Sequence, residues 1–223
     1  MQFKGIRKNP SAPQVDPAHI AALRELPVAA LSDNMHRNIG SVGLHPYHRP
    51  GPGTMAGTAV TIKSRGGDNL TLLRAFEFCR PGDVIVIDAD GDLANAVIGG
   101  ILSFYAATIG TVGVVLDGAI RDVAEIRARD FPVYARGVNH RGPYKDGPGE
   151  INVPVSVGGM LVNPGDIVVG DQDGLMAFSP KDAAWLIEKA RAHLATEAET
   201  MRAMKEGRWD RSFVDALEER CPN

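Results

Sequence analysis

Apolar residues in this chain gather in short runs that glycine, proline and aspartate interrupt. Uninterrupted apolar runs at 84–87 and 112–116 predict strands that lie in the interior of a sheet, and a run at 133–136 predicts another strand. Helices are expected at 99–107 and at 120–129, where apolar residues recur with helical spacing. Strands that alternate with helices in this order indicate an α/β fold.

The first third of the chain predicts an arm, two helices and a long loop. Residues 1–15 are polar and contain prolines, so they are expected to be extended. A helix is predicted to begin at Asp16 and Pro17, because aspartate caps free N–H groups and proline suits the first helical position. Eight glycines and prolines within 40–57 predict a loop, which precedes a strand at 59–63 and a helix from 69 to about 79 that Asp68 caps.

Two segments repeat the same order of residues. Residues 81–91 read PGDVIVIDADG and residues 164–174 read PGDIVVGDQDG. The simplest interpretation is a duplicated turn–strand–turn unit in two similar halves of one sheet system. The alternative is that Pro-Gly-Asp is a frequent turn before any strand. A further Asp-Gly pair at 117–118 predicts a turn after the 112–116 strand.

The chain ends in a predicted long helix. Ser179 can cap this helix, Pro180 occupies its first position, and a stripe of apolar residues continues to Gly207. The stripe is narrow and alanine-rich, with charged flanks on both sides. A helix of this kind packs on a neighbour more often than in a core, which favours an oligomer.

Charge and composition narrow the class of protein. The 223 residues include 24 Lys and Arg against 27 Asp and Glu, a net charge of −3. Proteins that neutralise phosphates usually carry a basic excess, so no nucleic-acid partner is expected. No apolar run approaches the roughly 18 residues of a membrane span, and the N-terminus lacks the apolar segment of a signal peptide. We therefore expect no membrane partner, a cytoplasmic location, and one domain over 1–223 with an N-terminal arm and a long C-terminal helix.

Several catalytic motifs are absent from the sequence. It contains no G-x-S-x-G turn, no Walker-type phosphate loop and no H-E-x-x-H. Cys79 and Cys221 form no C-x-x-C pair, which argues against a disulfide framework or a zinc–thiolate site. The acidic stretch 88–92 departs from a calcium loop, because its glycine is fourth where the loop needs it sixth.

Two predicted helix starts carry the candidate chemistry. Gly99 and Gly100 open one helix, where free N–H groups can hold a carboxylate. Arg121 and Asp122 follow the next strand, so both helix starts are expected at the same sheet edge. Arg121 can then pair with the same carboxylate, and Asp122 can coordinate a hard divalent cation. The alternative is that Asp122 only favours the helix dipole while Arg121 pairs with Glu125.

The segments GGIL at 99–102 and DGAIRDVAE at 117–125 resemble a known family. This family joins the 4-hydroxy-4-methyl-2-oxoglutarate aldolases, which also act on 4-carboxy-4-hydroxy-2-oxoadipate, to the regulators of ribonuclease activity A. The likeness runs from about residue 26 to 207. It implies a swivelling β/β/α fold and assembly as a homotrimer or hexamer, with the site between subunits.

The resemblance also implies roles for individual residues. Gly99 and Gly100 would open the site, and the backbone of Ile101 and Leu102 together with Arg121 would hold the pyruvate portion of a small 2-oxo acid substrate. Asp122 would bind Mg²⁺ or Mn²⁺.

The sequence departs from the aldolase pattern at Gly100, where the aldolases carry an acidic residue that holds a metal-bound water. Loss of that carboxylate predicts weaker metal binding or a shifted pKa of the water, and a different substrate range. In the aldolases a second acidic group comes from the C-terminal helix of a neighbouring subunit, and the resemblance makes Glu197 or Glu199 the candidate here.

The predicted activity is that of a divalent-metal-dependent class II aldolase. It would cleave a 4-hydroxy-2-oxo acid to pyruvate and a second keto acid, with oxaloacetate decarboxylation as a side reaction. Asp122→Ala is predicted to abolish metal-dependent turnover, and Arg121→Ala to weaken binding and turnover together. The alternative is a non-catalytic protein that binds and regulates a ribonuclease. A methyltransferase is less well supported, because no glycine-rich loop for its cofactor follows a first strand.

Overall fold

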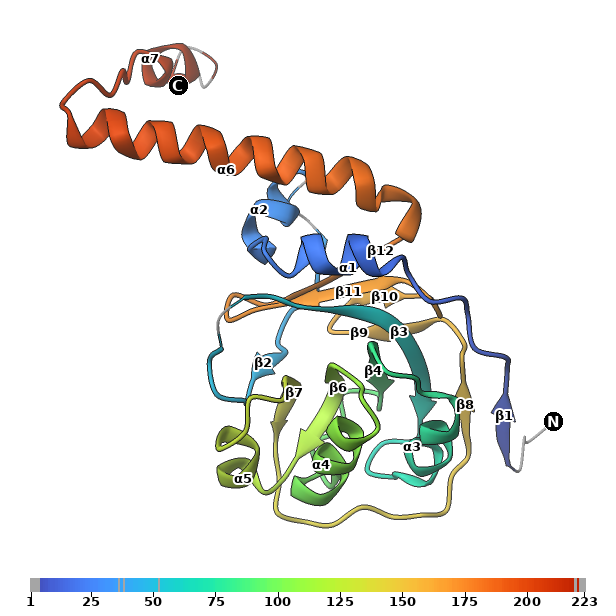
Figure 1. Cartoon of the computed structure of the whole chain (residues 1–223). Helices are drawn as coiled ribbons and strands as arrows, with labels where there is room; N and C mark the ends of the chain where they lie inside the picture. Colours follow the sequence, from blue (N-terminus) through green and yellow to red (C-terminus); the bar gives the residue numbers. More distant parts are fainter. Residues whose placement is uncertain (1–4, 36, 38, 52, 219, 221–223) are drawn as a thin grey trace.

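The computed structural model describes residues 5–35, 37, 39–51, 53–218 and 220, so Cys221 lies outside the described residues. The fold is mixed α/β, and its strands and helices form layers (Figure 1). The strands are β1 (Ile6–Lys8), β2 (His45–Pro46), β3 (Met55–Ser64), β4 (Asp83–Asp88), β5 (Ala96–Ile98), β6 (Gly113–Ile120), β7 (Val133–Val138), β8 (Gly149–Ile151), β9 (Val155–Val157), β10 (Met160–Val162), β11 (Ile167–Gly170) and β12 (Leu175–Phe178). The helices are α1 (Pro17–Leu23), α2 (Val28–Asp33), α3 (Leu70–Ala75), α4 (Gly100–Thr108), α5 (Val123–Arg127), α6 (Ala183–Lys205) and α7 (Phe213–Glu218), with 3-10 turns η1 (Phe76–Phe78) and η2 (Pro180–Asp182).

A parallel group of strands, β3–β4–β6–β7, forms the centre of the main sheet. The prediction that the 84–87 run is buried on both faces is confirmed. Ile85 and Ile87 pack in the core under α3, α4 and α5, whereas Val84 and Val86 pack in the core that faces the β9–β10 hairpin. Alternate residues of a strand point to opposite faces, so a run without polar interruption suits a sheet that is covered on both sides.

The two repeated segments both form a turn followed by a strand. They lie on either side of β3: β4 pairs with it in parallel, and β11 pairs with it antiparallel. Thr58 is opposite Asp83 in one ladder and opposite Ile167 in the other. The repeated units therefore meet at the same point of β3 and run in opposite directions.

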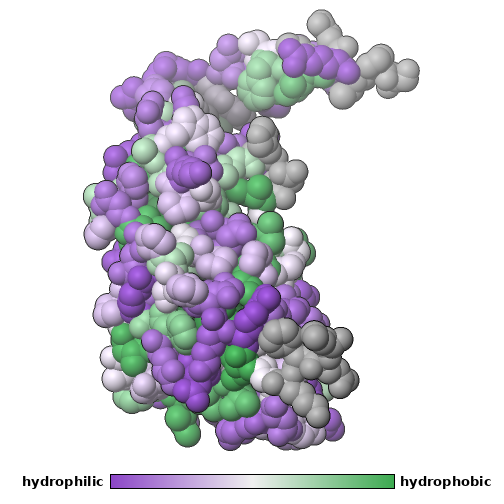
Figure 2. Space-filling view, turned by 90° about the vertical axis from the view of Figure 1, so that its right-hand side faces the viewer, coloured by the Kyte–Doolittle hydropathy of each residue, from purple (hydrophilic) through white to green (hydrophobic). Residues whose placement is uncertain are grey.

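The C-terminal helix begins as predicted. Ser179 accepts a hydrogen bond from the Lys181 backbone N–H, and Pro180 opens η2 directly before α6. Only the first part of α6 is buried, through Leu186, Ile187 and Ala190, in a core shared with α1 and α2. The rest of α6 and α7 project beyond the body of the molecule (Figures 1 and 2). Among the described residues, no helix combines the length and the apolar character that crossing a membrane requires.

Some predicted boundaries are wrong for identifiable reasons. Asp117 and Gly118 form no turn; they lie inside β6, which continues to pair with β5 and β7. The helix predicted at 120–129 begins only at Val123, because Asp122 is in the left-handed region with φ 58°. The strand predicted at 59–63 starts earlier, since its first residues pair with β11. The helix from 69 ends at 75 and continues as η1, and the N-terminal arm pairs with β8 through β1.

A row of charged side chains crosses the parallel strands on the face beneath the β9–β10 hairpin. Lys63 on β3 is opposite Asp88 on β4, which is opposite Asp117 on β6. Lys63 Nζ contacts Asp88 Oδ2 at 2.9 Å, and Arg136 on β7 pairs with Asp117 through Nε and Nη2. Asp117 also accepts a hydrogen bond of 2.6 Å from the backbone N–H of Gly158. The row therefore ties the sheet to the hairpin.

Candidate functional site

The start of α4 and the end of β6 meet, as the sequence predicted. The backbone N–H of Gly100 donates to Asp122 Oδ2 at 3.0 Å. The first N–H groups of a helix have no partner inside it, so those of Ile101 and Leu102 remain for another acceptor. The helix dipole adds positive potential at this point. This corner of the sheet edge is therefore suited to an anion.

The two glycines allow carboxylates to come close to the helix start. A Cβ on Gly99 would overlap Asp122 Oδ2 and Arg121 Cγ, and a Cβ on Gly100 would overlap Glu125 Oε2. Neither glycine has a positive φ, so close approach, not backbone conformation, accounts for the absence of a side chain. The Glu125 carboxylate occupies the position where a side chain at residue 100 would begin.

Arg121 and Asp122 lie at the junction between β6 and α5. The Arg121 backbone N–H donates to the Ile98 carbonyl at 3.0 Å, which links the end of β6 to β5. Arg121 Nε lies 3.7 Å from Asp122 Oδ2, and the two side chains are 41% and 40% exposed. The Arg121 backbone is held by β5 and the Asp122 carboxylate by the Gly100 N–H, while both side chains remain accessible to a small molecule.

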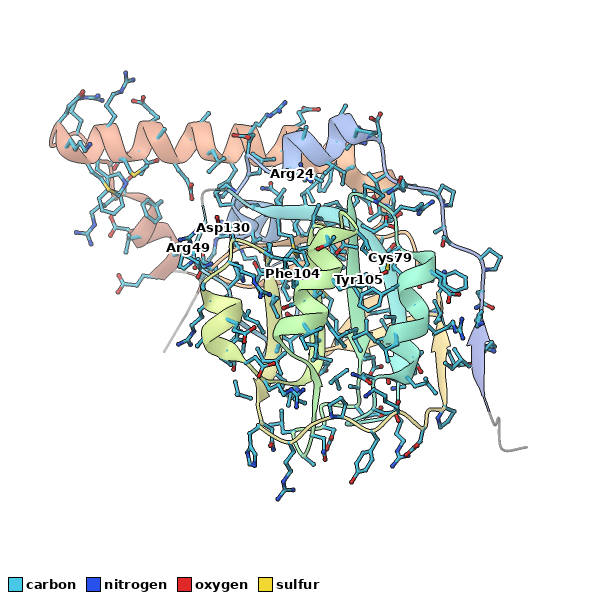
Figure 3. The ribbon with its side chains drawn as sticks, turned by 60° about the horizontal axis from the view of Figure 1, so that its bottom comes forward. Arg24, Arg49, Cys79, Phe104, Tyr105 and Asp130 are labelled. Carbon is cyan, nitrogen blue, oxygen red and sulfur yellow. The ribbon has the colours of Figure 1, made fainter. Side chains whose placement is uncertain are left out.

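The expected alternative pairing of Arg121 with Glu125 is not what the structure shows. Glu125 Oε2 instead lies 3.6 Å from Arg129 Nη2. Arg129 Nη1 donates to the Gly100 carbonyl at 2.9 Å, and its guanidinium lies over the Phe104 ring. Figure 3 shows Phe104 on the α5 side of α4 and Tyr105 on the α3 side. Arg121 is thus left to face the cavity, while Arg129 steadies α4 against α5.

A cavity of about 180 Å³ joins these groups. It is lined by Asn69, Leu73, Val97, Ile98, Gly99, Ile101, Leu102, Arg121, Asp122, Pro143 and Lys145. Of the residues that the sequence singled out, the structure brings Gly99, Ile101, Leu102, Arg121 and Asp122 to this cavity. Gly100 lies beside it, in contact with Asp122.

Two polar residues of the cavity, Asn69 and Lys145, were not expected from the sequence. The loop that carries Lys145 is held by the buried carboxylate of Asp68, which accepts backbone hydrogen bonds from Asp146 at 2.6 Å and Gly147 at 3.0 Å. The signal for Asn69 was present, because it follows a parallel strand at a predicted helix start and must lie at the same sheet edge. Lys145 lies in a loop without a periodic pattern, and nothing in the sequence placed it.

The donor set of the site fits a hard divalent cation only in part. Asp122 offers a carboxylate, and Glu125 is close to the same helix start. Within the described ranges, no group of three or more His, Cys, Asp or Glu side chains is arranged to hold a metal. Mg²⁺ in proteins is commonly held by one or two carboxylates, with water and substrate completing its shell, so the site is compatible with it.

The candidate glutamates of the C-terminal helix do not line the cavity of their own chain. Glu197 lies 3.2 Å from His193 Nε2, and Glu199 pairs with Arg202. Both lie on α6, which packs on α1 and α2, and neither is among the residues that line the cavity. A role for either in the site thus requires a second subunit.

The fold and the cavity define an α/β protein with a small cavity, lined by Arg121, Asp122 and the start of α4, at the carboxyl end of parallel strands. The model of the RraA-like family, described as Aldolase/RraA, matches residues 28–177. A protein of Halalkalibacterium halodurans named "Putative 4-hydroxy-4-methyl-2-oxoglutarate aldolase" is 36% identical over 189 residues, which cover 84% of this chain and 89% of that protein. The chain belongs to the RraA-like family.

Two solved structures show the same likeness. Streptomyces coelicolor RraAS2, described as an unusual member of the RNase ES inhibitor RraA protein family, has a TM-score of 0.77 at 26% identity, covering 85% of this chain and 98% of that one. An S-adenosylmethionine:2-dimethylmenaquinone methyltransferase of Geobacillus kaustophilus has a TM-score of 0.62 at 30% identity, covering 68% and 94%. The fold is therefore that of the family, whose members carry names from more than one functional class.

Proposed function

We propose that this protein is a divalent-metal-dependent lyase that cleaves a 4-hydroxy-2-oxo acid to pyruvate and a second keto acid. The observation that carries the proposal is the convergence of three groups at one small cavity: the α4 N-terminus, Arg121 and Asp122. The relative from Halalkalibacterium halodurans, whose name is that of an aldolase, supports the same class of reaction.

Arg121 and the start of α4 would bind the 2-oxo acid. A guanidinium pairs with a carboxylate through two parallel hydrogen bonds, which fixes orientation as well as charge. The free N–H groups of Ile101 and Leu102 would hold a second oxygen of the substrate. Lys145 supplies another positive charge at the cavity, which suits a substrate with a second carboxylate.

Asp122 would hold Mg²⁺ or Mn²⁺ beside the bound substrate. When bound, the cation supplies Lewis-acid polarisation of the keto oxygen. In the cleavage itself the C3–C4 bond breaks and its electron pair remains on the three-carbon fragment. The C4 hydroxyl gives its proton to water as the second keto acid forms, and C3 of the three-carbon fragment takes up a proton from water to give pyruvate. Arg121 stays paired with the carboxylate of that fragment throughout, so the developing charge forms in an environment that is already positive. Decarboxylation of oxaloacetate places the same charge on the same fragment and is proposed as a side reaction.

We also propose that the active assembly is a homotrimer or hexamer. The side chains of Ile101, which lines the cavity, and of Phe104 on the same helix are exposed, and within the described residues most of the second half of α6 is exposed as well. Light scattering after gel filtration measures the assembly directly, and a monomer at working concentration would refute it.

The deciding experiment couples pyruvate release to lactate dehydrogenase. Oxaloacetate and 4-hydroxy-4-methyl-2-oxoglutarate are each supplied with Mg²⁺, with Mn²⁺ and with EDTA. Pyruvate that EDTA abolishes supports the proposal. No pyruvate under any condition from a folded oligomer contradicts it for these substrates.

The structure sharpens the choice of variants. Because Asp122 has φ 58°, alanine would add backbone strain to the loss of the carboxylate, whereas asparagine tolerates this conformation. Asp122→Asn is expected to lower metal-dependent turnover by roughly 10²-fold or more, and Arg121→Ala to lower binding and turnover together. Arg74→Ala is the control, because Arg74 pairs with Glu77 in an exposed ion pair and is not among the residues that line the cavity. Full activity in Asp122→Asn would remove the metal role of this residue.

The second candidate function is regulation of a ribonuclease by direct binding. It is favoured by the likeness to Streptomyces coelicolor RraAS2 and by the exposed apolar side chains of α4. The same turnover assay separates the two candidates. Metal-dependent pyruvate release favours the lyase, and a silent but folded oligomer that inhibits an added endoribonuclease favours the regulator.

A further inference from the structure

Among the described residues, one buried polar atom of the cavity lining has no hydrogen-bond partner. Asn69 is 4% exposed, and the structure gives its Oδ1 no hydrogen bond, although the residue lines the cavity with Arg121 and Asp122. A buried acceptor that is left unpaired costs free energy, so buried side-chain oxygens are normally satisfied by protein, water or ligand.

The orientation of the Asn69 amide is fixed by its other contacts. Nδ2 donates to the Val97 carbonyl at 3.2 Å, so a flipped amide would bring two acceptors together. The backbone groups of Asn69 are also hydrogen-bonded: its N–H donates to the Tyr144 carbonyl, and its carbonyl accepts from the Leu73 N–H. Oδ1 is therefore the one atom of Asn69 left over, and it can only accept.

A keto acid without a hydroxyl group cannot supply the hydrogen bond that Asn69 Oδ1 lacks. Arg121, Lys145 and the α4 N–H groups are donors, which suit carboxylate and ketone oxygens. Carboxylate and ketone oxygens are acceptors, and none of them can donate to Asn69 Oδ1. A hydroxyl group on the ligand can.

We propose that Asn69 is a specificity-determining residue that accepts a hydrogen bond from the hydroxyl group of a hydroxylated 2-oxo acid. The inference rests on the proposed function, because it concerns the same cavity and adds the part of the substrate that Arg121 does not bind. A site that hydrogen-bonds a substrate hydroxyl rejects the analogue that lacks it, since the buried acceptor is then left unpaired.

The test compares 4-hydroxy-2-oxoglutarate with 2-oxoglutarate, which differ only in that hydroxyl. Both are titrated by NMR into the full-length protein in EDTA, so that binding is measured without metal-dependent turnover. The wild-type protein is expected to bind the hydroxylated acid about 10-fold more tightly or better. Asn69→Ala is expected to abolish this preference. Leu73→Ala, which alters the same cavity without a polar atom, is expected to keep it.

A wild-type measurement guards against a variant that fails to fold. With ¹⁵N-labelled asparagine, the Asn69 side-chain amide resonances are expected to shift on addition of the hydroxylated acid and not on addition of 2-oxoglutarate. Equal affinities in the wild type, an unchanged preference in Asn69→Ala, or no shift of these resonances would each overturn the proposal.

The result for Asn69 can be distinguished from the result for the proposed lyase activity. Adding Mg²⁺ or Mn²⁺ to the same sample reveals cleavage through the pyruvate methyl signal. Cleavage without a hydroxyl preference overturns only the role of Asn69. A hydroxyl preference without cleavage overturns the lyase and leaves Asn69 as a ligand contact.

Discussion

The partly buried ion pair between Asp117 and Arg136 leads to a prediction about the stability of the fold. The Asp117 carboxylate accepts from Arg136 Nε and Nη2 and from the Gly158 backbone N–H, so three donors converge on one charge. Asparagine has nearly the same shape but no charge, and its NH₂ group must face one of these donors. We therefore choose Asp117→Asn as the perturbation.

The expected loss is about 2–4 kcal/mol at neutral pH. A hydrogen bond to a charged group contributes about 1.5–3 kcal/mol, and breaking a buried pair by removing one partner costs about 3–5 kcal/mol. We take a lower range, because the Arg136 side chain is 33% exposed and recovers part of its hydration. For a chain of this length the loss corresponds to a fall in Tm of roughly 4–16 °C.

The dependence on pH supplies the sharper test. Burial alone would raise the pKa of Asp117, but hydrogen bonds from Arg136 and Gly158 and the charges of Arg136 and Lys63 outweigh it and hold the pKa below its usual value. The carboxylate therefore stabilises the fold fully above the unfolded-state pKa of about 3.9, and this contribution is lost as the pH falls through the lower folded-state pKa.

Wild type and Asp117→Asn are compared by thermal denaturation between pH 7 and about pH 2.5. The gap in Tm is expected to be largest at pH 7 and to narrow as the pH falls below the unfolded-state pKa. Asp130→Asn is the matched control, because Asp130 pairs with Arg49 in an exposed ion pair (Figure 3) worth about 0–1 kcal/mol. A gap that is the same at both ends of the pH range, or no larger than that of the control, would refute the reasoning.

Three further substitutions concern the site and the C-terminal helix. Gly99→Ala is expected to push the Asp122 carboxylate away from the Gly100 N–H and to lower turnover by roughly 10-fold or more, with little change in Tm; an active enzyme would show that the close approach at Gly99 is dispensable. Leu186→Ala, in the core that anchors α6, is expected to cost about 2–5 kcal/mol in urea denaturation. Met201→Ala, on the exposed part of α6, is expected to cost little in the monomer, and a large loss would mean that this part is covered in the assembly.

Much of the fold follows from local pattern, and the exceptions come from contacts between distant residues. The buried run at 84–87, the cap of α1 at Asp16 and the start of α6 are confirmed, because each depends on neighbours in the chain. The Asp117–Gly118 pair has the composition of a turn, but Asp117 is paired with Arg136 on the next strand. The tendency of these two residues to form a turn is overridden there by an ion pair with a residue on another strand, which a short stretch of sequence does not reveal.

The candidate site divides in the same way. The meeting of Gly100 and Asp122 was predictable, because strand–helix alternation places successive helix starts at one sheet edge. Lys145 was not predictable, because its position depends on the hydrogen bonds by which Asp68 holds a distant loop. The role of each residue in binding and catalysis stays a prediction until the variants above are measured.

The contact between Gly100 and Glu125 constrains the order in which mutations at this site can accumulate. Glu125 Oε2 fills the space that the first atom of a side chain at position 100 would need, and Arg129 Nη2 lies 3.6 Å from the same oxygen. An aspartate introduced at position 100 would bring two carboxylates to the same point, and their repulsion would oppose it. Neutralising Glu125 first, as in Glu125→Gln, removes that repulsion. The effect of a substitution at position 100 therefore depends on the residue at position 125. Changing Glu125 first avoids the repulsion, whereas changing Gly100 to aspartate first gives an intermediate with two negative charges close together.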